Sequence, residues 1–107
     1  MKENLVYKVG DLAAEAQKKI QDTFSDNNPM ISISHDLRKN GFAADTMTVQ
    51  NLKSNKRLIL VFHDAKPKWV DYEFGLISED PQMNFKPLSL DQLDKNQFVD
   101  WMMKDLV

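Results

Sequence analysis

The sequence predicts an α+β domain in which two helices precede a three-stranded antiparallel meander and a third helix closes the chain. Three observations predict this order. Two segments in the first 41 residues carry apolar side chains at helical spacing. Three segments between residues 46 and 77 alternate or are continuously apolar, and short polar links join them. The last segment returns to helical spacing, so the expected order is α-α-β-β-β-α in a single domain of residues 1–107.

The first helix is expected in "DLAAEAQKKIQDTF", where four apolar residues share one helical face: Leu12, Ala16, Ile20 and Phe24. Asp11 follows Gly10 and can act as the N-cap, because its carboxylate can accept from the free amides of the first turn. The first ten residues stay open, since "LVYKV" could be a short strand or an earlier start of the same helix.

The second helix is expected in "NPMISISHDLRKNG". Asn28 would be its cap, Pro29 its first residue and Gly41 its stop signal. Three apolar residues share a face at helical spacing: Met30, Ile33 and Leu37. A rival interpretation makes "MISIS" a strand, because these five residues also alternate between apolar and polar.

The three strands are expected in "TMTVQNL", "RLILVFH" and "KWVDYEFGLI", with an antiparallel meander favoured by the short links "KSNK" and "DAKPK". A loop, "SEDPQMNFKP", should lead to the closing helix. There Leu88 and Leu93 could form a hydrophobic staple around Ser89, with Gln92 completing a capping box. The stripe expected to be buried comprises Phe98, Trp101, Met102 and Leu106.

Strand register decides which side chains of the middle strand face the core. A turn at Ser54-Asn55 would place Val49 opposite Leu60, and a three-residue loop in "DAKPK" would place Leu60 opposite Tyr72. Both hairpins then give the same core face: Leu58, Leu60 and Phe62. The opposite, outer face would carry Ile59, Val61 and His63.

This outer face is the candidate binding surface, for which Trp69 would be the anchor because tryptophan is a favoured interface residue. Ile59 and Val61 would form its apolar floor. His63, Asp71 and Glu73 would form its polar rim, and Asp71 lies diagonally across from His63. A helix lying over the two aliphatic residues would remove the surface. Without such a cover, we expect a non-catalytic interaction module for a protein partner or for a second copy of the chain.

Val99 and Met103 also widen the apolar arc of the closing helix, which suggests a homodimer seam.

Composition limits the other functional classes. Lys and Arg number 14 and Asp and Glu number 16, so the formal charge of −2 does not favour nucleic acid. The chain has no cysteine, which excludes thiolate catalysis and cysteine-based zinc sites. No long apolar run resembles a membrane span or a signal peptide, so we expect a cytoplasmic protein with no membrane partner.

A weak nucleic-acid-binding function is the first alternative. Its candidate residues, which lie near the two hairpin turns, are Lys53, Lys56, Arg57, Lys66 and Lys68. The trailing α-β-β-β-α order resembles the double-stranded-RNA-binding fold. That family places lysines at the start of its last helix, whereas "SLDQLDKN" carries Asp91 and Asp94 here, so no residue is carried over.

A metal-dependent or acid–base enzyme is the second alternative, and it would use both His-Asp pairs: His35, Asp36, His63 and Asp64. Neighbouring residues in a strand or a helix point in different directions, so neither pair readily forms a dyad. The chain also lacks a glycine-rich phosphate loop and a nucleophile elbow. We therefore expect no catalytic residues, no metal and no cofactor.

Overall fold

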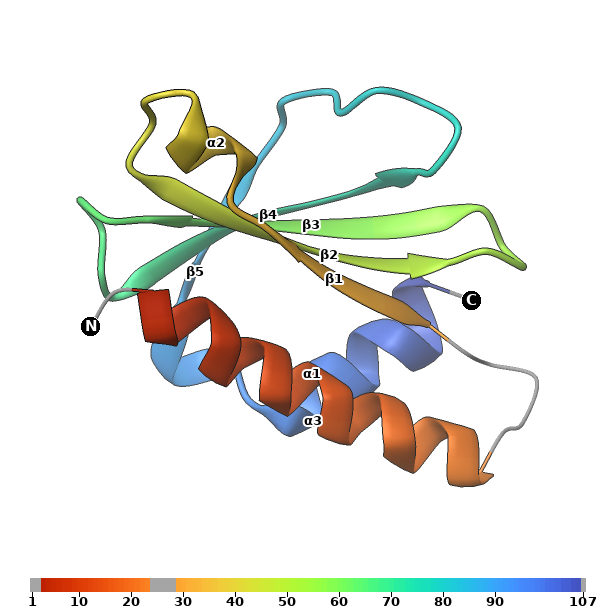
Figure 1. Cartoon of the computed structure of the whole chain (residues 1–107). Helices are drawn as coiled ribbons and strands as arrows, with labels where there is room; N and C mark the ends of the chain where they lie inside the picture. Colours follow the sequence, from red (N-terminus) through yellow and green to blue (C-terminus); the bar gives the residue numbers. More distant parts are fainter. Residues whose placement is uncertain (1–2, 24–28, 107) are drawn as a thin grey trace.

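A computed structural model describes residues 3–23 and 29–106 (Figure 1). The elements follow one another as α1 (Glu3–Thr23), β1 (Met30–Ser34), α2 (Asp36–Lys39), β2 (Ala44–Asn51), β3 (Lys56–His63), β4 (Trp69–Leu76) and β5 (Lys86–Ser89). A 3₁₀ turn, η1 (Leu90–Gln92), leads to α3 (Lys95–Asp100), which continues as the π-helical segment η2 (Trp101–Asp105). Phe24 and Asn28, to which the sequence assigned roles, lie outside the described residues.

The five strands form one antiparallel sheet in the order β1-β2-β3-β4-β5. Helices α1 and α3 cover one face of this sheet, which we call the inner face (Figure 1). The α+β class and the antiparallel meander are confirmed. The expected number of three strands and the second long helix are wrong, and the strand order does not reproduce the α-β-β-β-α pattern behind the double-stranded-RNA-binding resemblance.

The segment "MISIS" is strand β1 rather than the start of a helix. It pairs with β2 in a register that sets Ile31 opposite Val49 and Ile33 opposite Met47. This pairing lets both isoleucines pack against the core, whereas a helix would have lost the ladder with β2. Only the four residues of α2 are helical, and Gly41 follows them with a φ of +94°, as its role as a stop signal requires.

Helix α1 begins earlier than expected and runs through Gly10. Val6 and Val9 are buried, and their burial stabilises the first turns more than one interior glycine destabilises them. Asp11 therefore lies inside the helix and is not its N-cap. The expected apolar face is present, with Ala16 and Ile20 buried and Leu12 packed at its border.

The C-terminal part also departs from expectation in its caps. The predicted loop ends in β5, which pairs with β4 from Tyr72 back to Trp69. Ser89 makes no side-chain cap, and Asp94 instead caps α3 by accepting from the backbone N–H of Gln97 at 2.9 Å. The predicted stripe is confirmed, because its four members are all buried: Phe98, Trp101, Met102 and Leu106.

The first hairpin has a register two residues away from the expected one. Val49 pairs with Leu58, and residues 52–55 form the turn, in which Asn55 has a φ of 61°. An even shift leaves every side chain on the same face, because side chains alternate with a period of two. In the second hairpin Leu60 pairs with Tyr72 as expected. The predicted core face of β3 is therefore confirmed: Leu58, Leu60 and Phe62 are buried.

Candidate interaction surface

The outer face of the sheet carries the residues that the sequence placed there. Val61 pairs with Thr46 on one side and with Asp71 on the other, so all three side chains point away from α1 and α3. His63 lies at the end of β3, and its Nε2 is 3.2 Å from Oδ2 of Asp71. The diagonal partner expected for this histidine is therefore the one observed.

Two exposed aromatic side chains lie at this end of the sheet. Trp69 begins β4 and is 49% exposed, and Phe42 is 62% exposed. Phe42 stands two residues before Ala44, which pairs with His63 in the β2–β3 ladder. The segments that carry the two aromatics thus flank the end of β3. We call Phe42, His63, Trp69 and Asp71 the outer patch.

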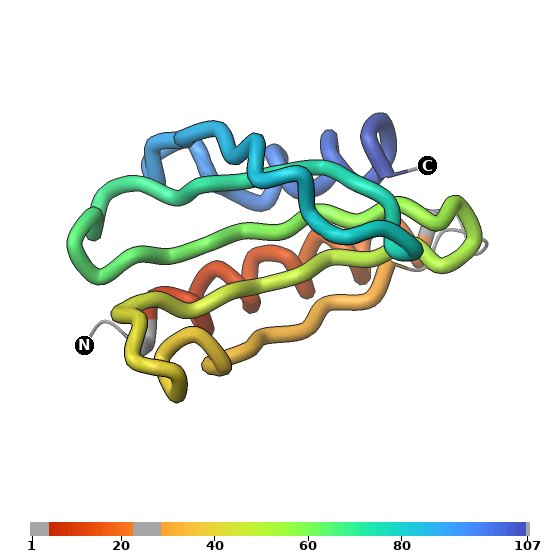
Figure 2. The backbone as a smooth tube through the Cα atoms, turned by 90° about the horizontal axis from the view of Figure 1, so that it is seen from above, coloured from red at the N-terminus to blue at the C-terminus, as the bar shows by residue number. Residues whose placement is uncertain are grey.

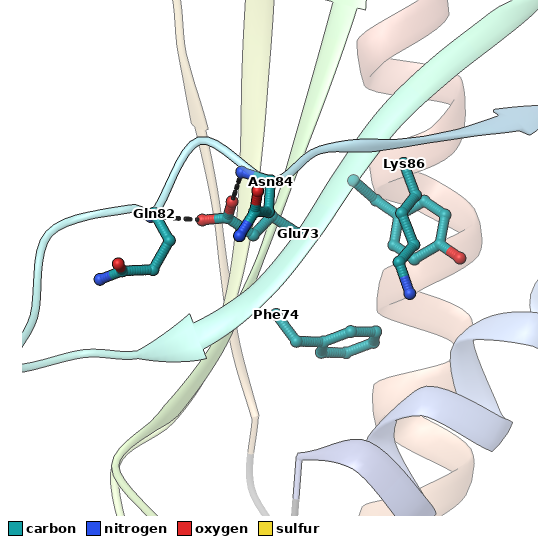
Figure 3. A pocket seen from close by; sticks show the side chains of 6 residues that line it. Glu73, Phe74, Gln82, Asn84 and Lys86 are labelled. Carbon is teal, nitrogen blue, oxygen red and sulfur yellow. Dashed lines mark hydrogen bonds between the residues drawn. The ribbon is translucent and has the colours of Figure 1, made fainter.

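The rest of the expected surface is less open. Val61 is only 8% exposed and Ile59 is half-buried, so these two residues lie beside the patch on the same face but do not form an accessible apolar floor. Glu73 is 7% exposed, and its carboxylate accepts hydrogen bonds from the backbone N–H groups of Gln82 and Asn84. It fixes the loop of residues 77–85 above the outer face, so it is a structural residue and no part of an open rim (Figures 1 and 3).

A pocket of about 260 Å³ lies beneath this loop (Figure 3). It opens where β5 stops pairing with β4, beyond Tyr72. Its lining residues are Tyr72, Glu73, Phe74, Gln82, Asn84 and Lys86. The rings of Tyr72 and Phe74 lie 5.3 and 5.9 Å from the ring of Trp101, so the aromatic wall belongs to the core. The carboxylate of Glu73 is already engaged by backbone amides. The other polar groups of the lining are the ammonium of Lys86, the hydroxyl of Tyr72 and the amide side chains of Gln82 and Asn84.

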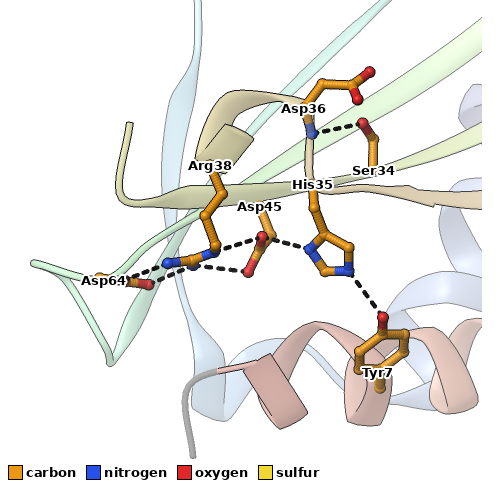
Figure 4. Close-up of polar contacts among 7 residues, drawn as sticks. All are labelled: Tyr7, Ser34, His35, Asp36, Arg38, Asp45 and Asp64. Atoms are coloured by element: carbon orange, nitrogen blue, oxygen red, sulfur yellow. Dashed lines mark hydrogen bonds and ion pairs between the residues drawn. The ribbon is translucent and has the colours of Figure 1, made fainter. Parts of the chain in front are cut away.

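A polar network lies at the same end of the sheet, toward α1 (Figure 4). The guanidinium of Arg38 in α2 binds two carboxylates, donating to Asp45 at 2.9 and 3.1 Å and to Asp64 at 2.9 Å. Nδ1 of His35 lies 2.6 Å from the Asp45 carboxylate, and its Nε2 lies 2.8 Å from the Tyr7 hydroxyl of α1. The network therefore joins α1, α2, β2 and the β3–β4 turn.

The charge distribution of this network follows from burial and pairing. Asp45 is 2% exposed, and the hydrogen bonds from Arg38 hold the pKa of this carboxyl below its ordinary value, with the bond from His35 acting in the same direction. An ionised carboxylate only accepts, so His35 donates from Nδ1, and in a neutral ring Nε2 accepts from the Tyr7 hydroxyl. The arrangement orients the phenol.

The two His-Asp pairs do not form the site that the enzyme alternative requires. His35 contacts Asp45, His63 contacts Asp71, and Asp64 contacts Arg38. Asp36 is exposed, and its backbone N–H donates to the hydroxyl of Ser34. Within residues 3–23 and 29–106 no group of three or more His, Asp or Glu side chains is placed to hold a metal ion.

The basic residues of the nucleic-acid alternative lie at opposite ends of β3. Lys53 lies in the β2–β3 turn and Lys56 and Arg57 begin β3, whereas Lys66 and Lys68 lie in the β3–β4 turn. Arg57 also donates to the backbone carbonyl of Glu79 at 2.6 Å, which engages part of its guanidinium within the fold. The five cations therefore form two separate groups.

Sequence reasoning missed Phe42 and most of the polar network, namely Tyr7, Arg38 and Asp45. Phe42 directly follows the glycine stop in "NGFAAD", and its only signal was a large aromatic side chain between the expected second helix and the first expected strand. Comparison with protein-family models, with curated proteins and with solved structures finds no match for this chain. In the part of the chain that the structure describes, no helix has the length and apolar character needed to span a membrane.

Proposed function

We propose that this chain is a non-catalytic interaction module that docks a protein partner on the outer patch. The observation that carries the proposal is the half-exposed indole of Trp69 beside the His63–Asp71 pair. A tryptophan held at the start of a paired strand offers a large apolar surface at a low cost in side-chain entropy.

The outer patch combines two kinds of contact. Trp69 and Phe42 supply apolar area, and we expect an apolar side chain of the partner to cover them. His63 and Asp71 supply a polar border. Because this ion pair is partly solvated, we expect it to contribute orientation and selectivity more than affinity.

The substitution Trp69→Ala tests the proposal. We expect it to abolish capture of the partner when the tagged chain is used for affinity purification from its native host. The melting temperature should change little, because half of the indole is already in solvent. Leu52→Ala is the matched control, since Leu52 is also exposed but lies in the turn at the other end of β3. This control should retain the partner.

Two results would count against the proposal. Capture of the same proteins by the Trp69→Ala variant would show that the patch is not the docking surface. A salt-sensitive mobility shift with RNA or DNA that depends on Lys66 and Lys68, and not on Trp69, would favour the nucleic-acid alternative.

A further inference from the structure

We propose that the free edge of β1 pairs with β1 of a second copy of this chain, antiparallel and centred on Ser32. The two five-stranded sheets would then join into one continuous sheet. Strand β1 is the terminal strand on its side, and no strand within residues 3–23 and 29–106 pairs with its outward edge. Backbone N–H and C=O groups along such an edge are a template for another strand.

The two edges of the sheet differ in how they resist pairing. The β5 edge has the sequence "KPLS", so it carries a lysine and a proline, the residues that most effectively block strand addition. The β1 edge has the sequence "MISIS", which contains neither a charged residue nor a proline. The residues of β5 therefore protect that edge against the addition of another strand, whereas the residues of β1 do not.

The β1 sequence is also self-complementary about its centre. In an antiparallel pair centred on Ser32, Ile31 of each copy lies opposite Ile33 of the other copy. Both isoleucines pack against the core on the inner face, so the pair would extend the two cores toward each other. Ser32 is exposed on the outer face and would meet its own counterpart. This symmetric match favours a second copy over an unrelated strand.

Helix α1 presents small residues to the middle of β1. Figure 2 shows β1 at the border of the molecule, with α1 lying inside that border, beneath the neighbouring strands. Gly10 brings the helix close to the strand, since a Cβ at this position would lie 3.0 Å from Cδ1 of Ile33. Ala14, one turn further along the same helix face, is exposed and small. Small residues of α1 therefore lie next to the centre of the proposed pair. The longer side chains of Tyr7 and Gln17 lie toward the two ends of β1, where they contact His35 and the carbonyl of Pro29.

Opposite charges at position 32 test the pairing. In a pair centred on this residue, Ser32→Lys places two lysines directly opposite each other, and Ser32→Glu does the same with two glutamates. We expect the wild-type chain to shift with concentration from its mass of 12.4 kDa toward twice that mass in sedimentation equilibrium. Each charged variant should dissociate with a dimer constant at least about tenfold weaker. An equimolar mixture of the two variants should recover the dimer.

The matched control is Thr48→Lys, which adds a charge to the same face on the next strand inward. Its two copies would lie beyond a Debye length of about 8 Å from each other, so the dimer should persist. A wild-type chain that stays monomeric at millimolar concentration would overturn the inference. A dimer that both Ser32 variants retain, or a mixture of variants that stays monomeric, would also overturn it. Loss of the dimer in Trp69→Ala alone would assign self-association to the outer patch.

Discussion

Asp45 points to the same side of β2 as Met47 and Val49, which are core residues. A buried carboxylate at such a position is costly unless it is paired and hydrogen-bonded. Arg38 satisfies both of its oxygens, and His35 donates to one of them. The charge is therefore held in place by two side chains that precede it in the chain, Arg38 in α2 and His35 immediately before α2.

The first prediction concerns this carboxylate. Asp45→Asn should lower the free energy of unfolding by about 2–4 kcal/mol, because it leaves the arginine and the histidine without a buried anion. The matched control Asp64→Asn removes the other carboxylate of Arg38, which is more exposed, and should cost about 1 kcal/mol. Chemical denaturation measures both values. Equal effects of the two variants would contradict the role given to Asp45.

Among the elements, the contact between α1 and β1 is unusually close at Gly10. Alanine is a better helix former than glycine by about 0.5–1 kcal/mol, which favours a substitution in the helix interior. The new methyl group would, however, meet Cδ1 of Ile33 at 3.0 Å. At position 10 the helix propensity of alanine therefore favours the substitution, whereas the contact of the new methyl group with Ile33 opposes it.

A double-mutant cycle separates the two effects. Ile33→Val removes the Cδ1 atom that the new methyl group would meet. In this valine background Gly10→Ala should stabilise the protein by about 0.5–1 kcal/mol, and in the wild-type background it should stabilise it less or destabilise it. Thermal unfolding of the four proteins measures the coupling. An identical effect of Gly10→Ala in both backgrounds would show that the close contact has no energetic cost.

At the scale of the whole molecule, the ionisation of Asp45 links global stability to pH. Its pKa in the folded protein is lowered from an ordinary value of 3.8, chiefly by the hydrogen bonds from Arg38. The hydrogen bonds of Arg38 with Asp64 and, second, with Asp45 raise the pKa of the guanidinium, so the arginine stays charged. As pH falls below the ordinary value, the unfolded chain binds a proton that the folded carboxylate does not. The stability that the Asp45 carboxylate contributes is therefore fully present above its ordinary pKa, and it is lost as the pH falls through the lowered pKa of the folded protein.

The comparison with Asp45→Asn isolates this contribution. The difference in unfolding free energy between wild type and variant should shrink progressively below about pH 4. Denaturant titrations at each pH provide the measurement. A difference that stays constant into the acid range would mean that the folded and unfolded carboxyl groups titrate alike.

Periodicity was sufficient to place most of the structure in sequence. The three central strands, the inner face of β3 and the buried stripe of the closing helix all follow from alternating or helical spacing, because each depends on one face being buried. The even register shift in the first hairpin left the outward direction of His63 unchanged for the same reason. Its partner Asp71 could be predicted because both positions belong to adjacent strands with a short connection.

Tertiary structure alone decided the features that depend on distant segments. The start and stop signals around "MISIS" favour a helix, although its alternation also suits a strand. Its ladder with β2, whose paired residues lie 12 to 20 positions further along the chain, makes it a strand. The network from Tyr7 to Asp64 and the loop held by Glu73 have no local pattern, because their bonds join residues that are far apart in the chain. Hydrophobic periodicity is written in neighbouring residues, whereas the pairing of buried charges is a property of the folded arrangement, and this is why the chain predicted its layers but not its polar contacts.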